Sequence, residues 1–246
     1  YSLEDAEIIK IPSFIKRIAP FAFYASSFLK IIDFDENSQL KSIGKFAFAN
    51  SSIENISIPK NVAQIETSAF AECNINFIDF DDESKLREIS SELFYDSTLI
   101  SITIPNRVTR ICDDAFFFCG QLKDLIINED SELRVIGNSA FYGTKLQSIS
   151  LSSSVELKKG WNNGLSEIKD IKIFKKKNEN IKIYKEFILG KSDIYQDIFD
   201  VILFVNPNID KVTIPSFIKC IKSHAFSNSK KLKFIEFENG SQLEKI

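Results

Sequence analysis

The sequence predicts an α/β repeat solenoid, a right-handed superhelix with one parallel β-sheet, short helical turns and an inserted β-hairpin. Three observations predict this fold class. An Ala-Phe pair recurs at nearly constant intervals, an Ile-rich alternating stretch follows each pair, and 44% of the 246 residues are apolar, enough for a continuous core. One strand and one turn cannot bury an apolar side alone, so neighbouring units must stack.

The Ala-Phe pair marks the predicted helical turn of each unit. Between Ala22 and Ala140 the successive steps are 25, 22, 24, 22 and 25 residues, and Leu93-Phe94 replaces Ala-Phe in one unit. An Ile lies four residues before each of these positions, as Ile18 does before Ala22. Spacings of four and five place Ile, Ala and Phe on one face of a helix, which indicates a short helical turn.

The stretch after each pair predicts a strand. It reads apolar-x-x-apolar-x-apolar, as in Leu29-Ile32-Phe34 and Ile53-Ile56-Ile58, and is rich in Ile. Such alternation is typical of a short strand with one buried face. Each strand is followed either by Ile-Pro, as at Ile58-Pro59, or by an acidic turn that ends in Ser-x-Leu. The two exits alternate through the first six units, which gives a double repeat of about 46 residues.

The combined pattern, Ile-Pro-x-x-Val-x-x-Ile-x-x-x-Ala-Phe-x-x-Cys-x-x-Leu-x-x-Ile, resembles the BspA-type, or Treponema pallidum-type, leucine-rich repeat. Its closest form runs from Ile58 through Val62, Ile65, Ala69, Phe70 and Cys73 to Ile78. The resemblance covers nearly the whole chain, although Ile outnumbers Leu and no Asn ladder follows the strands. It implies a leucine-rich repeat horseshoe. It also implies an adhesin-like protein, at the cell surface or secreted, that binds host matrix or other cells.

The repeat is interrupted near the C-terminus. Between Ile173 and Ile209 the strand spacing grows to 36 residues, and the apolar stretches 181–184, 187–189 and 201–205 fall in this interval. We expect an inserted β-hairpin that covers the solenoid core on one side. The alternative is one degenerate repeat with a long loop.

The pattern then restarts. Residues 214–246 align without gaps to residues 11–43, with 18 identities in 33 positions. We therefore divide the chain into a leucine-rich repeat block (1–173), an inserted hairpin region (174–208) and the start of a second block (209–246), which stops partway through a repeat. We expect the chain to be a segment of a longer protein.

The composition argues against several functions. The 31 basic and 34 acidic side chains nearly balance, which disfavours a nucleic-acid partner. The single histidine, His224, excludes most histidine-based triads and metal sites, and neither a glycine-rich phosphate loop nor a nucleophile motif is present. No apolar run approaches the roughly 20 residues of a spanning helix. We expect no enzyme, cofactor or metal, and membrane attachment only through parts outside this segment.

The four cysteines do not indicate a disulfide or a zinc site. They form no CxxC pair, and Cys73 and Cys119 each follow a repeat Phe by three residues, two units apart. Equivalent positions two strands apart are separated by roughly 10 Å, beyond the Cα distance that a disulfide allows. We expect both to be buried free thiols.

The candidate binding site is the solvent-facing side of the predicted strands. There, an acid paired with a hydrophobe alternates with pairs of small polar residues. The predicted partner-binding residues on this concave face are Ile31, Asp33, Phe77, Asp79, Asp124, Ile126 and Asp170. Exposed apolar side chains on the inner face of a solenoid indicate a protein partner, here a host matrix or cell-surface protein.

Two alternatives stay open at this point. The alternating pattern could serve only to keep the sheet soluble, without any partner. The same surface could also serve an intracellular, cytoplasmic leucine-rich repeat scaffold with an endogenous partner. Because a solenoid end exposes core, self-association into a homo-oligomer is a further expectation.

Overall fold

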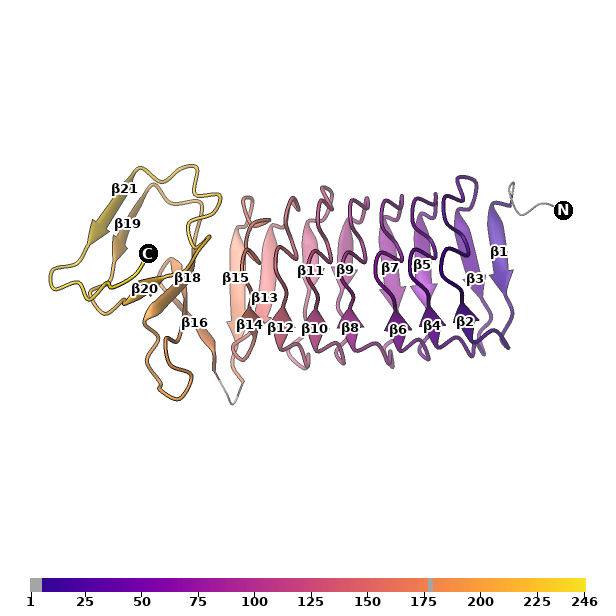
Figure 1. Ribbon diagram of the computed structural model, residues 1–246, viewed down its shortest axis with the longest axis horizontal. Helices are drawn as coiled ribbons and strands as arrows, with labels where there is room; N and C mark the ends of the chain where they lie inside the picture. The colour runs from indigo at the N-terminus through magenta and orange to yellow at the C-terminus, as the bar shows by residue number, and fades with distance from the viewer. Residues whose placement is uncertain (1–5, 177–178) are drawn as a thin grey trace.

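The computed structural model describes residues 6–176 and 179–246, and its first feature is a long parallel sheet (Figure 1). Eight strands pair in parallel, one from each successive unit, so strand neighbours in the sheet are neighbours in the repeat. They are β1 (Ile8–Ile11), β3 (Ile31–Phe34), β5 (Asn55–Ile58), β7 (Phe77–Phe80), β9 (Ser101–Thr103), β11 (Asp124–Ile126), β13 (Ser148–Ser152) and β15 (Asp170–Phe174). The predicted parallel solenoid is confirmed.

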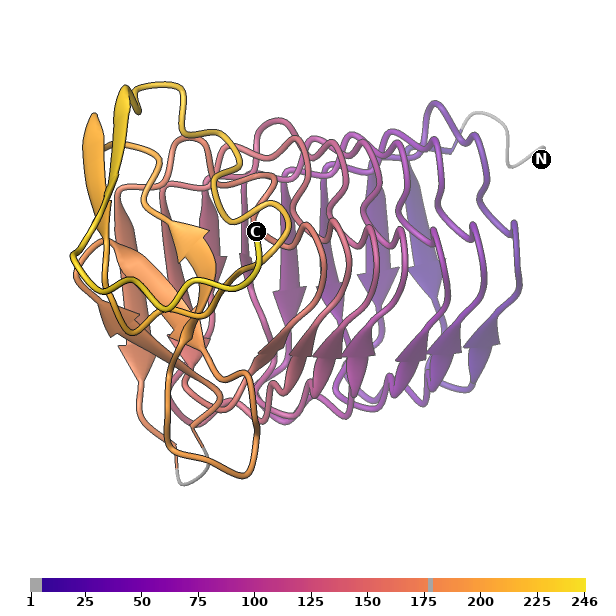
Figure 2. The same cartoon turned by 60° about the vertical axis from the view of Figure 1, so that its left-hand side comes forward.

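A second set of strands lies across the core from this sheet (Figure 2). Each has two residues, and they pair in parallel as a three-stranded and a four-stranded ladder. They are β2 (Arg17–Ile18), β4 (Ser42–Ile43), β6 (Gln64–Ile65), β8 (Glu88–Ile89), β10 (Arg110–Ile111), β12 (Val135–Ile136) and β14 (Glu156–Leu157). The expectation of a single parallel sheet was therefore wrong: the Ile before each Ala-Phe pair belongs to a strand.

The predicted helical turns are also wrong, because the described residues contain no helix. Each Ala-Phe segment is a turn that contains two residues with positive φ four positions apart, such as Phe46 (φ 55°) and Asn50 (φ 56°). An α-helix requires negative φ at every residue. The amide N–H of Phe48 donates to the carbonyl oxygen of Ala69 in the next unit, at 2.9 Å. Hydrogen bonds between units replace those within a helix, so the fold is all-β.

The repeat phenylalanines form a continuous stack through the core. Successive ring centroids are 5.2–5.8 Å apart, and the ring planes deviate from parallel by 7–21°. The stack contains Phe23, Phe48, Phe70, Phe94, Phe116 and Phe141. Each aromatic pair contributes about 0.5–1.5 kcal/mol beyond the burial of its surface. The stack therefore links each unit to its two neighbours.

The interval after β15 contains the predicted hairpin and one strand more. β16 (Ile181–Tyr184) and β17 (Phe187–Gly190) pair antiparallel, and β17 pairs antiparallel with β18 (Val201–Val205). The hairpin is confirmed, and the degenerate-repeat alternative is wrong.

This small sheet is buried on both faces rather than on one. On β17, Ile188 packs into the core of the first block, whereas Phe187 and Leu189 pack into a second core. On β18, Phe204 joins the first core and Ile202 joins the second. Burial on both faces explains why these strands read as continuous apolar runs without alternation.

The last strands of the chain again include long and short strands that pair in parallel. β19 (Lys211–Ile214) pairs in parallel with β21 (Phe234–Phe237), and β20 (Cys220–Ile221) pairs in parallel with β18. The turn at residues 224–228 lies against the turn at residues 161–163 of the first block through two side-chain hydrogen bonds. The inserted sheet thus lies between two sets of repeats (Figure 1).

Candidate functional site

The structure places all seven sequence-predicted site residues on the outward side of the eight-stranded sheet. We call this surface the long-strand face. The hydrophobes are about half exposed, with 47% for Ile31, 51% for Phe77 and 48% for Ile126. The four predicted acids on β3, β7, β11 and β15 are exposed as well. The predicted orientation of these residues is therefore correct.

The strand register arranges the face as two parallel rows. The first row runs through Ile8, Ile31, Asn55, Phe77, Ser101, Asp124, Ser148 and Asp170. In the second row, Lys10 lies beside Asp33, Ser57 beside Asp79, Thr103 beside Ile126, and Ser150 beside Lys172. The acids therefore do not form one stripe, because Asp33 and Asp79 lie in the second row while Asp124 and Asp170 lie in the first.

Two of the four acids are engaged in ion pairs. Lys10 Nζ lies 3.7 Å from Asp33 Oδ2, and Lys172 Nζ lies 3.6 Å from Asp170 Oδ2. Within the described residues, Asp79 and Asp124 form no ion pair. The structure thus distinguishes a central quartet, Phe77, Asp79, Asp124 and Ile126, on strands that flank β9.

Each row contains one acid and one hydrophobe of the quartet. The hydrophobe lies on β7 in the first row and on β11 in the second. Phe77 and Asp124 share the first row, on either side of Ser101. Residues two strands apart in a row are separated by about 10 Å. Ser101 and Thr103 of β9 lie between the quartet residues of β7 and those of β11.

Sequence reasoning missed two residues of the same face. Ile8, which is 55% exposed, extends the first row, and Lys10 neutralises Asp33 in the second. Both lie on β1, where no Ala-Phe pair precedes the strand to mark its register. The alternation Ile8-Ile9-Lys10-Ile11 was the signal that could have identified them.

A groove borders the quartet at the end of the strands. Its volume is about 540 Å³, and its walls include Ser57 and Asp79 from the sheet and Asp35 and Asp81 from the acidic turns. Lys60 at its edge is held by Glu83 at 2.8 Å. The groove is therefore acidic and continuous with the second row of the long-strand face.

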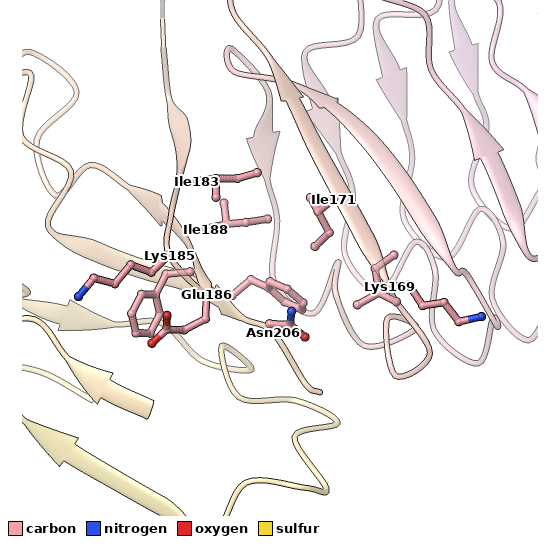
Figure 3. A pocket seen from close by; sticks show the side chains of 10 residues that line it. Lys169, Ile171, Ile183, Lys185, Glu186, Ile188 and Asn206 are labelled. Carbon is pink, nitrogen blue, oxygen red and sulfur yellow. The ribbon is translucent and has the colours of Figure 1, made fainter. Parts of the chain in front are cut away.

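A smaller pocket of about 110 Å³ lies where the eight-stranded sheet meets the inserted sheet (Figure 3). Ile171, Ile183 and Ile188 point into it, while Lys169 and Lys185 point away from it. Ligand pockets usually have volumes of about 300–1,000 Å³ and contain converging polar groups. This apolar seam is therefore a packing feature between two sheets, and nothing about it indicates a substrate site.

The cysteines are all free, and the buried pair is chemically inert. Burial raises the pKa of the Cys73 thiol to about 11 and that of Cys119 to about 12, against the opposing effect of hydrogen bonds with Ser51 and Ser97. A thiol is nucleophilic only as thiolate. The prediction of buried free thiols at both positions is confirmed.

Within 6–176 and 179–246, no group of three or more His, Cys, Asp or Glu side chains could hold a metal ion. In the same parts of the chain, no helix meets the length and apolarity that crossing a bilayer requires.

Solved structures share this fold. A pneumococcal vaccine antigen, PcpA, matches with a TM-score of 0.67 and 22% identity over 98% of this chain and 57% of its own. A leucine-rich repeat protein of Bacteroides ovatus matches with a TM-score of 0.56 and 20% identity over 97% of this chain and 74% of its own. A leucine-rich repeat protein of Eubacterium ventriosum matches with a TM-score of 0.57 and 18% identity over 96% of this chain and 57% of its own. The chain thus spans little more than half the length of two of these proteins.

Sequence comparison identifies the family. No curated protein matches the chain. The family model of the BspA type leucine-rich repeat region matches in six copies, over residues 1–99, 41–161, 87–196 and 197–246. These matches extend over the whole sequence, and the stacked parallel strands are those of a leucine-rich repeat solenoid. The chain belongs to the BspA-type leucine-rich repeat family, a family of protein-interaction modules.

Proposed function

We propose that this chain is a non-enzymatic, adhesin-like module of a surface protein, and that it binds a host or neighbouring-cell protein through the long-strand face. The observation that carries the proposal is the quartet of Phe77, Asp79, Asp124 and Ile126. Two half-exposed hydrophobes and two carboxylates without ion pairs among the described residues stand on one rigid sheet. Exposed apolar side chains rimmed by polar groups are typical of protein-binding surfaces.

The arrangement favours a protein over a small molecule. The quartet occupies a broad, open sheet surface, and the adjoining groove adds further acids. A surface fixed by parallel pairing on both sides of each strand loses little conformational entropy on binding, so more of the contact energy appears as affinity. Burial of Phe77 and Ile126 against a partner contributes hydrophobic free energy to binding. Asp79 and Asp124 select a partner with basic groups.

Surface location is part of the proposal. PcpA, which shares the fold, is described as a vaccine antigen. We assign binding to the first repeat block, residues 1–173, and treat 174–208 as an inserted region and 209–246 as the start of a second block. The predicted residues Ile31, Asp33 and Asp170 extend the surface around the quartet.

The location can be tested with an antibody raised against residues 6–176. Intact, unpermeabilised cells that produce the protein are labelled before and after brief treatment with an external protease. We expect surface signal that the protease removes, with a cytoplasmic protein of the same cells as the control for lysis. Signal that appears only after permeabilisation would contradict the surface assignment.

A further inference from the structure

A second surface, separate from the long-strand face, carries an exposed cluster of aromatic rings. It lies on the turn segments of three successive units, at the position after the repeat phenylalanine. Tyr95 and Phe117 stack with centroids 5.6 Å apart, and Phe117 and Tyr142 stack at 4.8 Å. Phe118 meets Phe117 edge-on at 4.6 Å. Phe118 and Tyr142 are 45% and 39% exposed, so the cluster faces solvent.

Phe118 is held at the surface by its backbone. Its φ is 59°, in the left-handed region that bulky residues rarely occupy. Asn50 and Asn228 occupy the same position of the turn in other units, also with positive φ. In the next unit the position belongs to Gly143, where an added Cβ would approach Phe118 Cδ1 to 2.5 Å. The ring can lie across this turn because Gly143 has no side chain.

Carboxylates lie on the same turns as the cluster. Glu92, Asp96 and Asp113 are exposed, and Asp114 is half-buried. Burial, followed by the charges of Asp113 and Glu92, raises the pKa of Asp114, so these acids lie close enough to interact. The amide of Asp96 donates to the carbonyl oxygen of Phe117 at 2.8 Å, which places this acid beside the rings.

Basic side chains are missing from these two turns. Residues 90–98 and 112–120 contain no Lys or Arg. Within the described chain, none of the ion pairs involves Glu92, Asp96, Asp113 or Asp114. The patch therefore combines aromatic rings with negative charge that no neighbouring cation neutralises by direct contact.

From the exposed rings of Phe118 and Tyr142, the half-buried rings of Tyr95 and Phe117 stacked against them, and the carboxylates on the same turns, we infer that this turn-segment patch binds a cationic protein segment rich in arginine. Guanidinium groups stack on aromatic faces and pair with carboxylates at the same time. An anionic surface, such as a nucleic acid or an acidic membrane, is repelled by the four carboxylates.

The test uses a fluorescein-labelled peptide of alternating arginine and serine, titrated with the full chain and followed by fluorescence anisotropy. The control peptide carries citrulline in place of arginine, which keeps the shape and removes the charge. We expect saturable binding of the arginine peptide and a weaker signal for the citrulline peptide. Failure of the wild-type chain to bind the arginine peptide overturns the inference.

Substitutions can show whether the peptide binds at this patch or is attracted only by the net negative charge of the chain. Phe118→Asn places a residue that other turns carry at this position, so the fold is kept, as checked by Trp161 emission and a thermal melt. We expect an about fourfold loss of affinity, the size of one exposed cation–π contact. The pair D96N and D113N should weaken binding in the same way.

The matched control is the pair D210N and E244Q, which removes the same charge from exposed acids outside both this patch and the long-strand face. We expect this control to bind the peptide like the wild-type chain. Equal losses for the two charge pairs, together with unchanged binding by F118N, would overturn the inference. None of these variants alters the quartet, so any binding of the peptide to the long-strand face is the same in all of them. A loss of binding in F118N therefore reports the turn-segment patch, whether or not the long-strand face binds its own partner.

Discussion

Asn162 Nδ2 donates a hydrogen bond of 2.7 Å to the carbonyl oxygen of His224, 62 residues further along the chain. Asn162 is buried and occupies the place of the repeat phenylalanine, so the phenylalanine stack ends at Phe141 and a polar contact takes over. Asn228 Nδ2 donates in return to the carbonyl oxygen of Asn163, at 2.8 Å. The turn at residues 224–228 is therefore attached to the turn at residues 161–163.

Replacing Asn162 with Ala should weaken this attachment. The substitution leaves the carbonyl oxygen of His224 without its amide partner, which costs about 1–3 kcal/mol. Trp161, the single tryptophan, lies 3% exposed beside Phe204 at this junction, so its emission reports unfolding here. We expect a lower urea midpoint by tryptophan fluorescence. The control is Asn74→Ala at an exposed asparagine of the first block, and an equal midpoint for the two variants would contradict the role of Asn162.

The phenylalanine stack can be compared with the long-strand face by two matched substitutions. Phe70 is fully buried between Phe48 and Phe94, whereas Phe77 is 51% exposed. Phe70→Ala should lower the free energy of unfolding by about 3–5 kcal/mol through lost burial and a cavity. Phe77→Ala should change it by less than about 1 kcal/mol. Chemical denaturation measures both, and similar losses would mean that Phe77 belongs to the core.

The buried thiols predict a loss of stability at alkaline pH. In the folded chain the pKa values of Cys73 and Cys119 are raised to about 11 and 12, above the ordinary value of 9.0. Above pH 9 the unfolded chain releases these protons while the folded chain retains them, so stability falls as pH rises toward 11 and 12. Below pH 9 both states hold the protons and the effect is absent.

Thermal melts from pH 8 to about pH 11 would show this dependence. The matched variant is C73S with C119S, since Ser51 and Ser97 fill the same repeat position in the intervening units. We expect a smaller alkaline loss in the double variant than in the wild-type chain. If the melting temperature falls equally with pH in the two proteins, groups other than Cys73 and Cys119 account for the effect.

Charge reversal on the long-strand face tests the proposed function. We expect D33K, D79K and D124K together to abolish adhesion to a panel of immobilised matrix proteins and intact epithelial cells, because each lysine repels a basic partner surface. These side chains are exposed, so the thermal melt should stay close to that of the wild-type chain.

The control for charge reversal is Asp210→Lys with Glu244→Lys, two exposed acids outside the eight-stranded sheet. This variant should adhere normally. Normal adhesion by the triple variant as well would place the binding surface elsewhere, either on the turn segments or on the inserted sheet.

The long strands could be predicted from the sequence, because alternation with a period of two in a regular repeat indicates stacked strands. The turns could not. Ile18, Ala22 and Phe23 have the spacing of a helix face, but the same spacing arises when a two-residue strand precedes a turn that pairs with its neighbours. Glycine usually marks left-handed backbone, yet here Phe21 and Ala25 occupy such positions, so the signal was missing.

The outward orientation of the candidate site residues could be predicted, but which of the acids form ion pairs could not. Alternation along each strand showed that Phe77 and Asp79 face outward together. It could not show that Lys10 neutralises Asp33, because that pair depends on the register between β1 and β3. The aromatic patch was missed because the position after the repeat phenylalanine varies, with Ala49 in one unit and Tyr95 in another.

The sheet of β16, β17 and β18 also constrains how such a chain can be lengthened by gene duplication. Residues 214–246 repeat residues 11–43 at an offset of 203 positions, and the sheet lies between the two copies. Because Ile188 and Phe204 belong to one core and Leu189 and Ile202 to the other, a crossover inside residues 181–205 would leave one core without its cover. Duplications that preserve the fold are therefore expected to have their boundaries outside residues 181–205. Each added block would then keep an intact sheet that covers its core.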